Sequence, residues 1–128
     1  MKRRIVWPVA VALTVASFGA AAPAMAGADD VVKEGNCSDA STWKLKLSPE
    51  DGNIEVEFEV DQNVVGDTWR VVMGHNGERF FRGKRTTKAP SGSFEVRRVV
   101  EDLDGTDTIK ARARNTSTDE VCVGRASI

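Results

Sequence analysis

The chain contains no tyrosine, a single histidine and only two cysteines among its 128 residues. One histidine and two cysteines cannot complete a structural zinc set, so we expect no metal site of that kind. The sequence also lacks a phosphate-binding glycine loop, a His-x-x-x-His pair and a Gly-x-Ser-x-Gly elbow. These absences favour a protein that is not an enzyme and holds no cofactor.

The first 26 residues have the three parts of a secretory signal peptide. Lys2-Arg3-Arg4 gives a positive start, an apolar run extends from Ile5 to Ala22, and Ala24-Met25-Ala26 is a small-x-small cleavage site. We expect cleavage after Ala26 and a secreted product. An uncleaved membrane anchor is the rival interpretation, because the apolar run approaches the length of a bilayer span. No second long apolar run follows, so we expect no membrane attachment after cleavage.

Removing 26 of the 128 residues leaves 102, the size of one small domain that packing alone stabilises only marginally. Cleavage also removes three of the 18 basic residues, so 15 remain against 19 acidic ones, a net charge of −4. This mild acidity argues against a general nucleic-acid binder. We divide the chain into a signal peptide (1–26), an N-terminal segment with Cys37 (27–42) and a β-sandwich domain (43–128), and we expect a monomer.

From Trp43 onward, apolar residues recur at every second position, which is the period of a strand with one buried face. Residues 48–53 read as a turn, and Asn76-Gly77 is a type I′ hairpin signal. The predicted strands are 43–47, 54–60, 68–74, 78–85, 93–100, 108–114 and 120–125. We therefore predict an all-β, immunoglobulin-like sandwich of about seven antiparallel strands.

One stretch resembles the sixth strand of immunoglobulin and fibronectin type III domains, where Asp-x-Tyr-x-Cys-x-Ala-x-Asn is common. The matching residues are Asp107, Ile109, Ala111, Ala113 and Asn115. Trp69, followed by Val71 and a hairpin, resembles the core tryptophan of their third strand. Ile109 replaces the family's corner tyrosine and Ala111 its second core cysteine, so no central disulfide is implied. The segments 43–47 and 89–94 also resemble small secreted actinobacterial proteins that carry no assigned function.

Cys37 and Cys122 are the candidates for a disulfide. In a sandwich of this topology the first and last strands lie side by side, which brings Cys37, just before the first strand, near Cys122 in the last. An export signal implies an oxidising compartment. We expect one disulfide that closes nearly the whole domain and serves stability; two separate thiols are the alternative.

Three groups of polar residues contain residue types that are common in functional sites. His75 adjoins the hairpin signal, and we interpret it as a solvated turn residue. The glutamates at 55, 57 and 59 alternate strictly, which indicates a solvated strand face. The acidic loop 101–107 could offer oxygen ligands to calcium. Its spacing departs from that of the twelve-residue EF-hand loop, so we interpret it as an ordinary turn.

Charge is divided unevenly along the chain. Residues 27–67 hold three basic and eleven acidic groups, whereas residues 79–98 are strongly basic. The basic residues of the second segment are Arg79, Arg82, Lys84, Arg85, Lys88, Arg97 and Arg98. They either keep the surface soluble or form a patch for an anionic partner, such as a protein or an anionic cell-wall polymer. Phe80 and Phe81 are adjacent, so we expect one in the core and one outside among the arginines.

Together these features predict a secreted, non-catalytic binding or surface-interaction module. A secreted protein inhibitor or a carrier of apolar ligands is the alternative, with the loop 88–92 as the segment that would face a protease.

Overall fold

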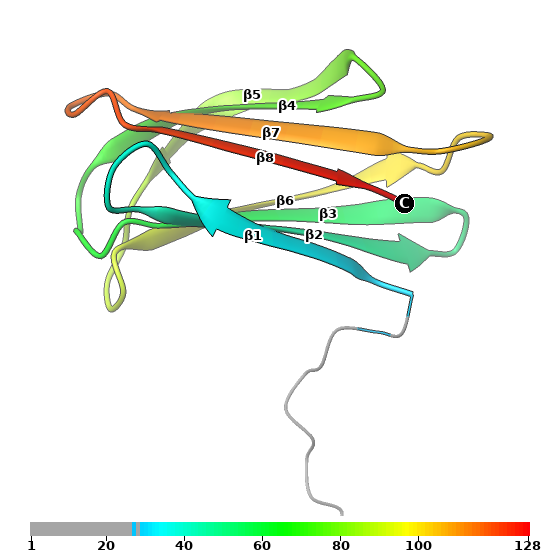
Figure 1. The fold of residues 1–128 in the computed structure, drawn as a ribbon, viewed down its shortest axis with the longest axis horizontal. Coiled ribbons are helices and arrows are strands. Elements are labelled where there is room, and N and C mark those ends of the chain that lie inside the picture. Colours follow the sequence, from blue (N-terminus) through cyan, green and yellow to red (C-terminus); the bar gives the residue numbers. More distant parts are fainter. Residues whose placement is uncertain (1–26, 28) are drawn as a thin grey trace, which may run out of the picture.

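The computed structural model describes residue 27 and residues 29–128, and the expected signal peptide lies outside these residues. The described part forms two four-stranded antiparallel sheets that pack face to face as a β-sandwich (Figure 1). One sheet has the strand order β1-β2-β3-β6 and the other β5-β4-β7-β8. In chain order the strands are β1 (Val31–Asn36), β2 (Thr42–Glu50), β3 (Asn53–Asp61), β4 (Thr68–His75), β5 (Glu78–Thr86), β6 (Ser93–Glu101), β7 (Thr108–Asn115) and β8 (Val121–Ser127).

The alternating apolar residues meet between the two sheets, which confirms the predicted all-β sandwich. Leu45, Phe58, Trp69, Val71 and Ile109 are all fully buried. Burying a large apolar side chain contributes about 1.5–3 kcal/mol, so these inward rows are the main source of stability. Among the described residues, no helix is long and apolar enough to cross a membrane.

The structure contains one strand more than the seven predicted. β1 pairs with β2 along the edge of the first sheet, with Val31 opposite Leu47 and Gly35 opposite Trp43. The turn expected over 48–53 is also shorter, because β2 continues to Glu50 and only Asp51 and Gly52 separate it from β3. Their φ angles of 48° and 77° suit a two-residue hairpin turn. The Asn76-Gly77 hairpin is confirmed, with φ angles of 49° and 84°.

Trp43 fills the corner of the sandwich where β1 and β8 approach each other. A Cβ atom added at Gly35 would lie 2.7 Å from the indole ring, and one added at Gly124 would lie 2.8 Å from it. Both glycines are therefore required by close approach to the same ring. They let the indole close the gap between the two sheets.

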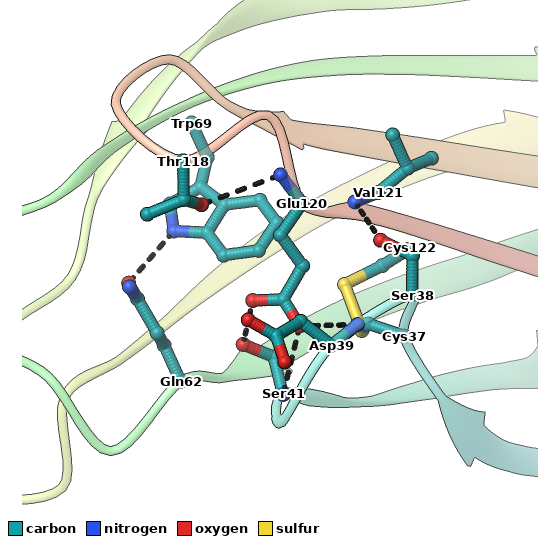
Figure 2. Close-up of a disulfide and its surroundings, with 10 residues drawn as sticks. All are labelled: Cys37, Ser38, Asp39, Ser41, Gln62, Trp69, Thr118, Glu120, Val121 and Cys122. Carbon is teal, nitrogen blue, oxygen red and sulfur yellow. Dashed lines mark hydrogen bonds between the residues drawn. A yellow bond between two sulfur atoms is a disulfide. The ribbon is translucent and has the colours of Figure 1, made fainter.

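The predicted disulfide between Cys37 and Cys122 is confirmed, with the two Cα atoms 4.3 Å apart. Cys37 follows β1 and Cys122 lies in β8, so the bond joins one sheet to the other. Beside it the Glu120 carboxylate turns toward the loop between β1 and β2 (Figure 2). It accepts hydrogen bonds from the backbone N–H groups of Asp39 and Ser41, at 3.0 and 2.9 Å. The loop is thus held both covalently and by a buried carboxylate.

Candidate functional site on the outer face of one sheet

The seven basic residues predicted as a patch lie on separate surfaces, because β5 and β6 belong to different sheets. Arg79, Arg82 and Lys84 are exposed and project outward from β5, opposite the outward residues of β4. Lys88 lies in the loop between β5 and β6, where its backbone bridges to Ser93. Only the three β5 residues share a common face.

The other three basic residues have partners elsewhere. The guanidinium carbons of Arg85 and Arg98 lie 5.2 and 4.5 Å from the centre of the Phe81 ring, so both cations cover an aromatic core residue at the corner between β5 and β6. Arg97 projects from the outer face of the opposite sheet. It donates a hydrogen bond to the Glu55 carboxylate at 2.6 Å.

The strand register adds five basic residues to the three of β5. Outward positions on β4, β7 and β8 alternate with buried ones, as they do on β5. The resulting basic face, as we call it, consists of Arg70, Arg79, Arg82, Lys84, Lys110, Arg112, Arg114 and Arg125. Alternation in 108–114 indicates an outward basic row, but only the register shows that this row lies between β4 and β8, in the same sheet as β5.

Like charges lie directly opposite one another on the basic face. Arg70 pairs with Lys84 on one side and with Arg114 on the other, and Lys110 pairs with Arg125. Each like-charge pair of this kind disfavours the sheet by an energy of roughly 0.2–1 kcal/mol. Within the described residues, the one carboxylate that forms an ion pair with this face is Asp119, 2.8 Å from Arg114 at its rim. Like-charge pairing on this face therefore lowers the stability of the free protein.

The remaining outward positions of these four strands are small, hydroxyl-bearing or aliphatic. None of them is acidic or aromatic in the described structure. Val72 and Val123 lie within the basic face and are 40% and 45% exposed. The surface therefore combines dense positive charge with two small apolar contacts.

The basic face is hollowed around Gly74. A depression of about 720 Å³ is lined by Val72, Gly74, Arg79, Lys110 and Arg125, among others. Gly74 lies at a register shift between β4 and β5, opposite Arg79 on β5 and Lys110 on β7. The missing side chain leaves a gap between two cations.

The outer face of the opposite sheet carries the reverse charge. Its outward carboxylates are Glu34, Glu50, Glu55, Glu57, Glu59, Asp61, Glu95 and Glu101. Three cations lie among them, namely Lys44, Lys46 and Arg97. Both lysines lie opposite glutamates of β3, with Lys44 opposite Glu59 and Lys46 opposite Glu57.

The glutamates of β3 are less solvated than predicted. The Glu55 side chain is only 12% exposed, and the hydrogen bond from Arg97 holds the pKa of its carboxyl below the usual range. Burial and the neighbouring charge of Glu95 raise the pKa of Glu57. The prediction of a fully solvated face was wrong for Glu55, because β6 adds a cation at its side.

His75 is not a solvated turn residue, so that prediction was also wrong. Its side chain is 10% exposed, and its Nε2 atom lies 2.5 Å from the carboxylate of Asp107, which is 1% exposed. Asp107 also accepts a hydrogen bond from the backbone N–H of Leu103 at 3.2 Å. The acidic turn between β6 and β7 therefore anchors the end of β4.

The expectation for the two phenylalanines holds for Phe81 alone. Phe81 is 8% exposed and belongs to the core, but Phe80 is half-buried and also packs against it. The register shift at Gly74 leaves Phe80 without a partner on β4, so alternation from the neighbouring residues does not determine where its side chain lies. Phe80 does not lie outside among the arginines.

Comparison of the chain with protein-family models, with curated proteins and with solved structures found no match.

Proposed function

We propose that this chain is a secreted, non-catalytic binding module that attaches to an anionic partner through its basic face. One observation carries the proposal: eight exposed or half-exposed cations share one sheet surface without acidic residues among them. Like charges arranged in this way destabilise the free protein. An anionic surface would relieve that repulsion on binding and would also steer the encounter.

Two further features support secretion and a non-catalytic role. The Cys37–Cys122 disulfide suits an oxidising extracellular setting, as does the signal-peptide pattern of residues 1–26. Without β1, the strand order β2-β3-β6 and β5-β4-β7-β8 is the order of fibronectin type III domains, which supports the immunoglobulin-like classification. Sandwiches of this type commonly present a sheet face or loops to a partner.

Neutralising the face tests the proposal. The variant Arg70→Gln/Arg82→Gln/Arg112→Gln should bind immobilised anionic cell-wall polymer at least about tenfold more weakly than the unmodified protein, which corresponds to about 1.4 kcal/mol. The measurement is a binding isotherm at low and at physiological salt, with the protein in its oxidised form. Binding of the unmodified protein should weaken as salt rises.

The matched control removes the same charge elsewhere. Lys33, Lys44 and Lys88 are exposed and lie outside the basic face, so the triple Gln variant at these positions should bind almost normally. Equal losses in the two variants would mean that net charge alone, and not the face, controls binding. Unchanged binding of the first variant would overturn the proposal.

The inhibitor alternative concerns the loop between β5 and β6. Its backbone is internally bonded, with the N–H of Gly92 donating to the carbonyl of Lys88 at 2.8 Å. Gly92 in turn accepts from the N–H of Gln62 at 3.0 Å. A panel of secreted proteases assayed with and without the protein separates this alternative from the proposed module.

A further inference from the structure

We propose that the basic face binds a linear polymer of small polyols joined by phosphodiesters, and that one phosphate occupies the hollow at Gly74. This inference rests on the proposed function and specifies its ligand. Three features support it: the cations, the apolar groups between them and the shape of the surface at Gly74.

The cations indicate an extended ligand with repeating negative charge. They are spread over four adjacent strands and not gathered at one point. Neighbouring strands lie about 4.8 Å apart, and outward residues on one strand lie about 6.7 Å apart. A single small anion could contact only part of this array, whereas a chain with a charge on every repeat could follow it.

The type of cation favours phosphate or carboxylate groups. Six of the eight are arginines, namely Arg70, Arg79, Arg82, Arg112, Arg114 and Arg125. The guanidinium group presents a planar fork of donors that matches both oxyanions, and it is favoured where such recognition matters. The choice between the two therefore depends on the rest of the surface.

The absence of outward aromatic side chains on these described strands decides against two polymer classes. Proteins that bind single-stranded nucleic acids stack the bases on aromatic rings, and no such ring is present on the basic face. A uronic-acid polymer would present pyranose rings, whose apolar C–H faces likewise gain most from aromatic partners. Val72 and Val123 offer small aliphatic contacts instead. These suit the short CH₂ and CH links of a polyol phosphate chain.

Gly74 provides the place for one phosphate. Its φ lies outside the left-handed region, and an added Cβ would come no closer than 3.5 Å to the Glu78 carbonyl oxygen, an ordinary contact. The backbone therefore does not require glycine here. What glycine provides is space between Arg79 and Lys110, with Arg125 next in the same row.

Poly(glycerol phosphate) is the probe, titrated into the oxidised protein at fixed ionic strength. It should bind at least about tenfold more tightly than single-stranded DNA or polygalacturonate of equal charge. Gly74→Val places a branched side chain between Arg79 and Lys110 without changing charge and should weaken binding by about fivefold or more. Ser48→Val, on the outer face of the opposite sheet, is the matched control and should bind normally. Amide NMR shifts should be largest at Gly74 and Lys110.

Each result separates the inference from the proposed function. Equal affinity for polygalacturonate or DNA would overturn the phosphodiester assignment and leave the anion-binding module standing. Normal binding by a folded Gly74→Val protein, with no amide shifts at Gly74, would overturn the hollow as the phosphate position. If Gly74→Val does not fold, Gly74→Ala and the amide shifts of the unmodified protein decide the same point. No binding to any of the three polyanions would overturn both proposals.

Discussion

At the scale of single residues, Trp43 is the side chain whose neighbours are most closely constrained. The indole ring leaves no room for a Cβ atom at Gly124 or at Gly35. Gly74 offers a contrast, because an added Cβ there makes only an ordinary contact. Gly35 and Gly124 must therefore be glycine because of the indole ring, whereas packing does not require glycine at position 74, and substitution can distinguish the two cases.

Gly124→Ala should lower the free energy of unfolding by about 1–3 kcal/mol, because the methyl group overlaps the indole and forces a shift in a packed region. Urea denaturation measures the change. Gly74→Ala is the control and should be close to neutral. The loss at Gly124 should shrink in a Trp43→Leu background, and an undiminished loss there would contradict the contact as its cause.

Protonation of Asp67 at low pH should destabilise the end of the sandwich where its carboxylate contacts Gln62 and Asn115. Hydrogen bonds from the side-chain amides of Asn115 and Gln62, at 2.9 and 2.6 Å, hold the pKa of this carboxyl below its ordinary value. A lowered pKa in the folded state stabilises the protein above the unfolded value. That contribution disappears as the pH falls through the folded pKa.

Asp67→Asn should therefore reduce stability at neutral pH and flatten the acid side of the stability curve. Urea unfolding from neutral to strongly acidic pH measures both effects. Asp51→Asn is the control, since Asp51 is an exposed turn residue with φ 48°, which asparagine tolerates. An unchanged acid slope in Asp67→Asn would show that Asp67 does not contribute to the pH dependence.

Burial of individual polar residues was the least predictable feature at this scale. His75 adjoins a hairpin turn in the sequence, yet its partner Asp107 follows 32 residues later. Glu55 belongs to a strictly alternating strand, and its partner Arg97 is 42 residues away. Alternation predicts which way a side chain points, but the neighbouring strand determines what covers it.

At the scale of elements, the disulfide and Glu120 together attach the loop between β1 and β2 to the start of β8. The cysteines are separated by 85 residues. A crosslink over such a distance restricts the unfolded chain strongly, and removal of a native disulfide from a small domain costs about 2–5 kcal/mol. The bond lies away from the outward positions of the basic face, because Cys122 points into the core.

Cys37→Ala/Cys122→Ala should thus unfold at lower urea concentration while its affinity for an anionic polymer, measured on the folded protein, stays the same. Adding reductant to the unmodified protein should reproduce the loss of stability, and adding it to the double variant should have no further effect. A drop in affinity without unfolding would indicate that the disulfide shapes the binding surface.

The strands themselves were largely predictable from residue 43 onward, because one buried face imposes a period of two. β1 departs from that pattern. Val31 and Val32 are adjacent, and only Val31 packs against the core. An edge strand with so little buried surface is held by its ladder to β2, which sequence periodicity does not reveal.

At the scale of the whole molecule, the two outer faces carry opposite charge, and the strand register determines which residues belong to each face. The basic residues of 79–98 predicted a positive region, but that region divides between the sheets. The basic face forms only when Arg70, Lys110, Arg112, Arg114 and Arg125 join β5 through the register. Long-range strand pairing is therefore the information that the sequence pattern lacked.

The opposed charges of the two outer faces give the sandwich an electric dipole directed across its layers. Near a negatively charged surface this dipole exerts a torque, so the molecule turns β5-β4-β7-β8 toward the surface before any contact forms. A molecule bound in the proposed way would present the carboxylates of β1, β2, β3 and β6 to the surrounding medium. A surface covered by this protein would thus remain negatively charged on its outer side, although every molecule would be held by its positive face.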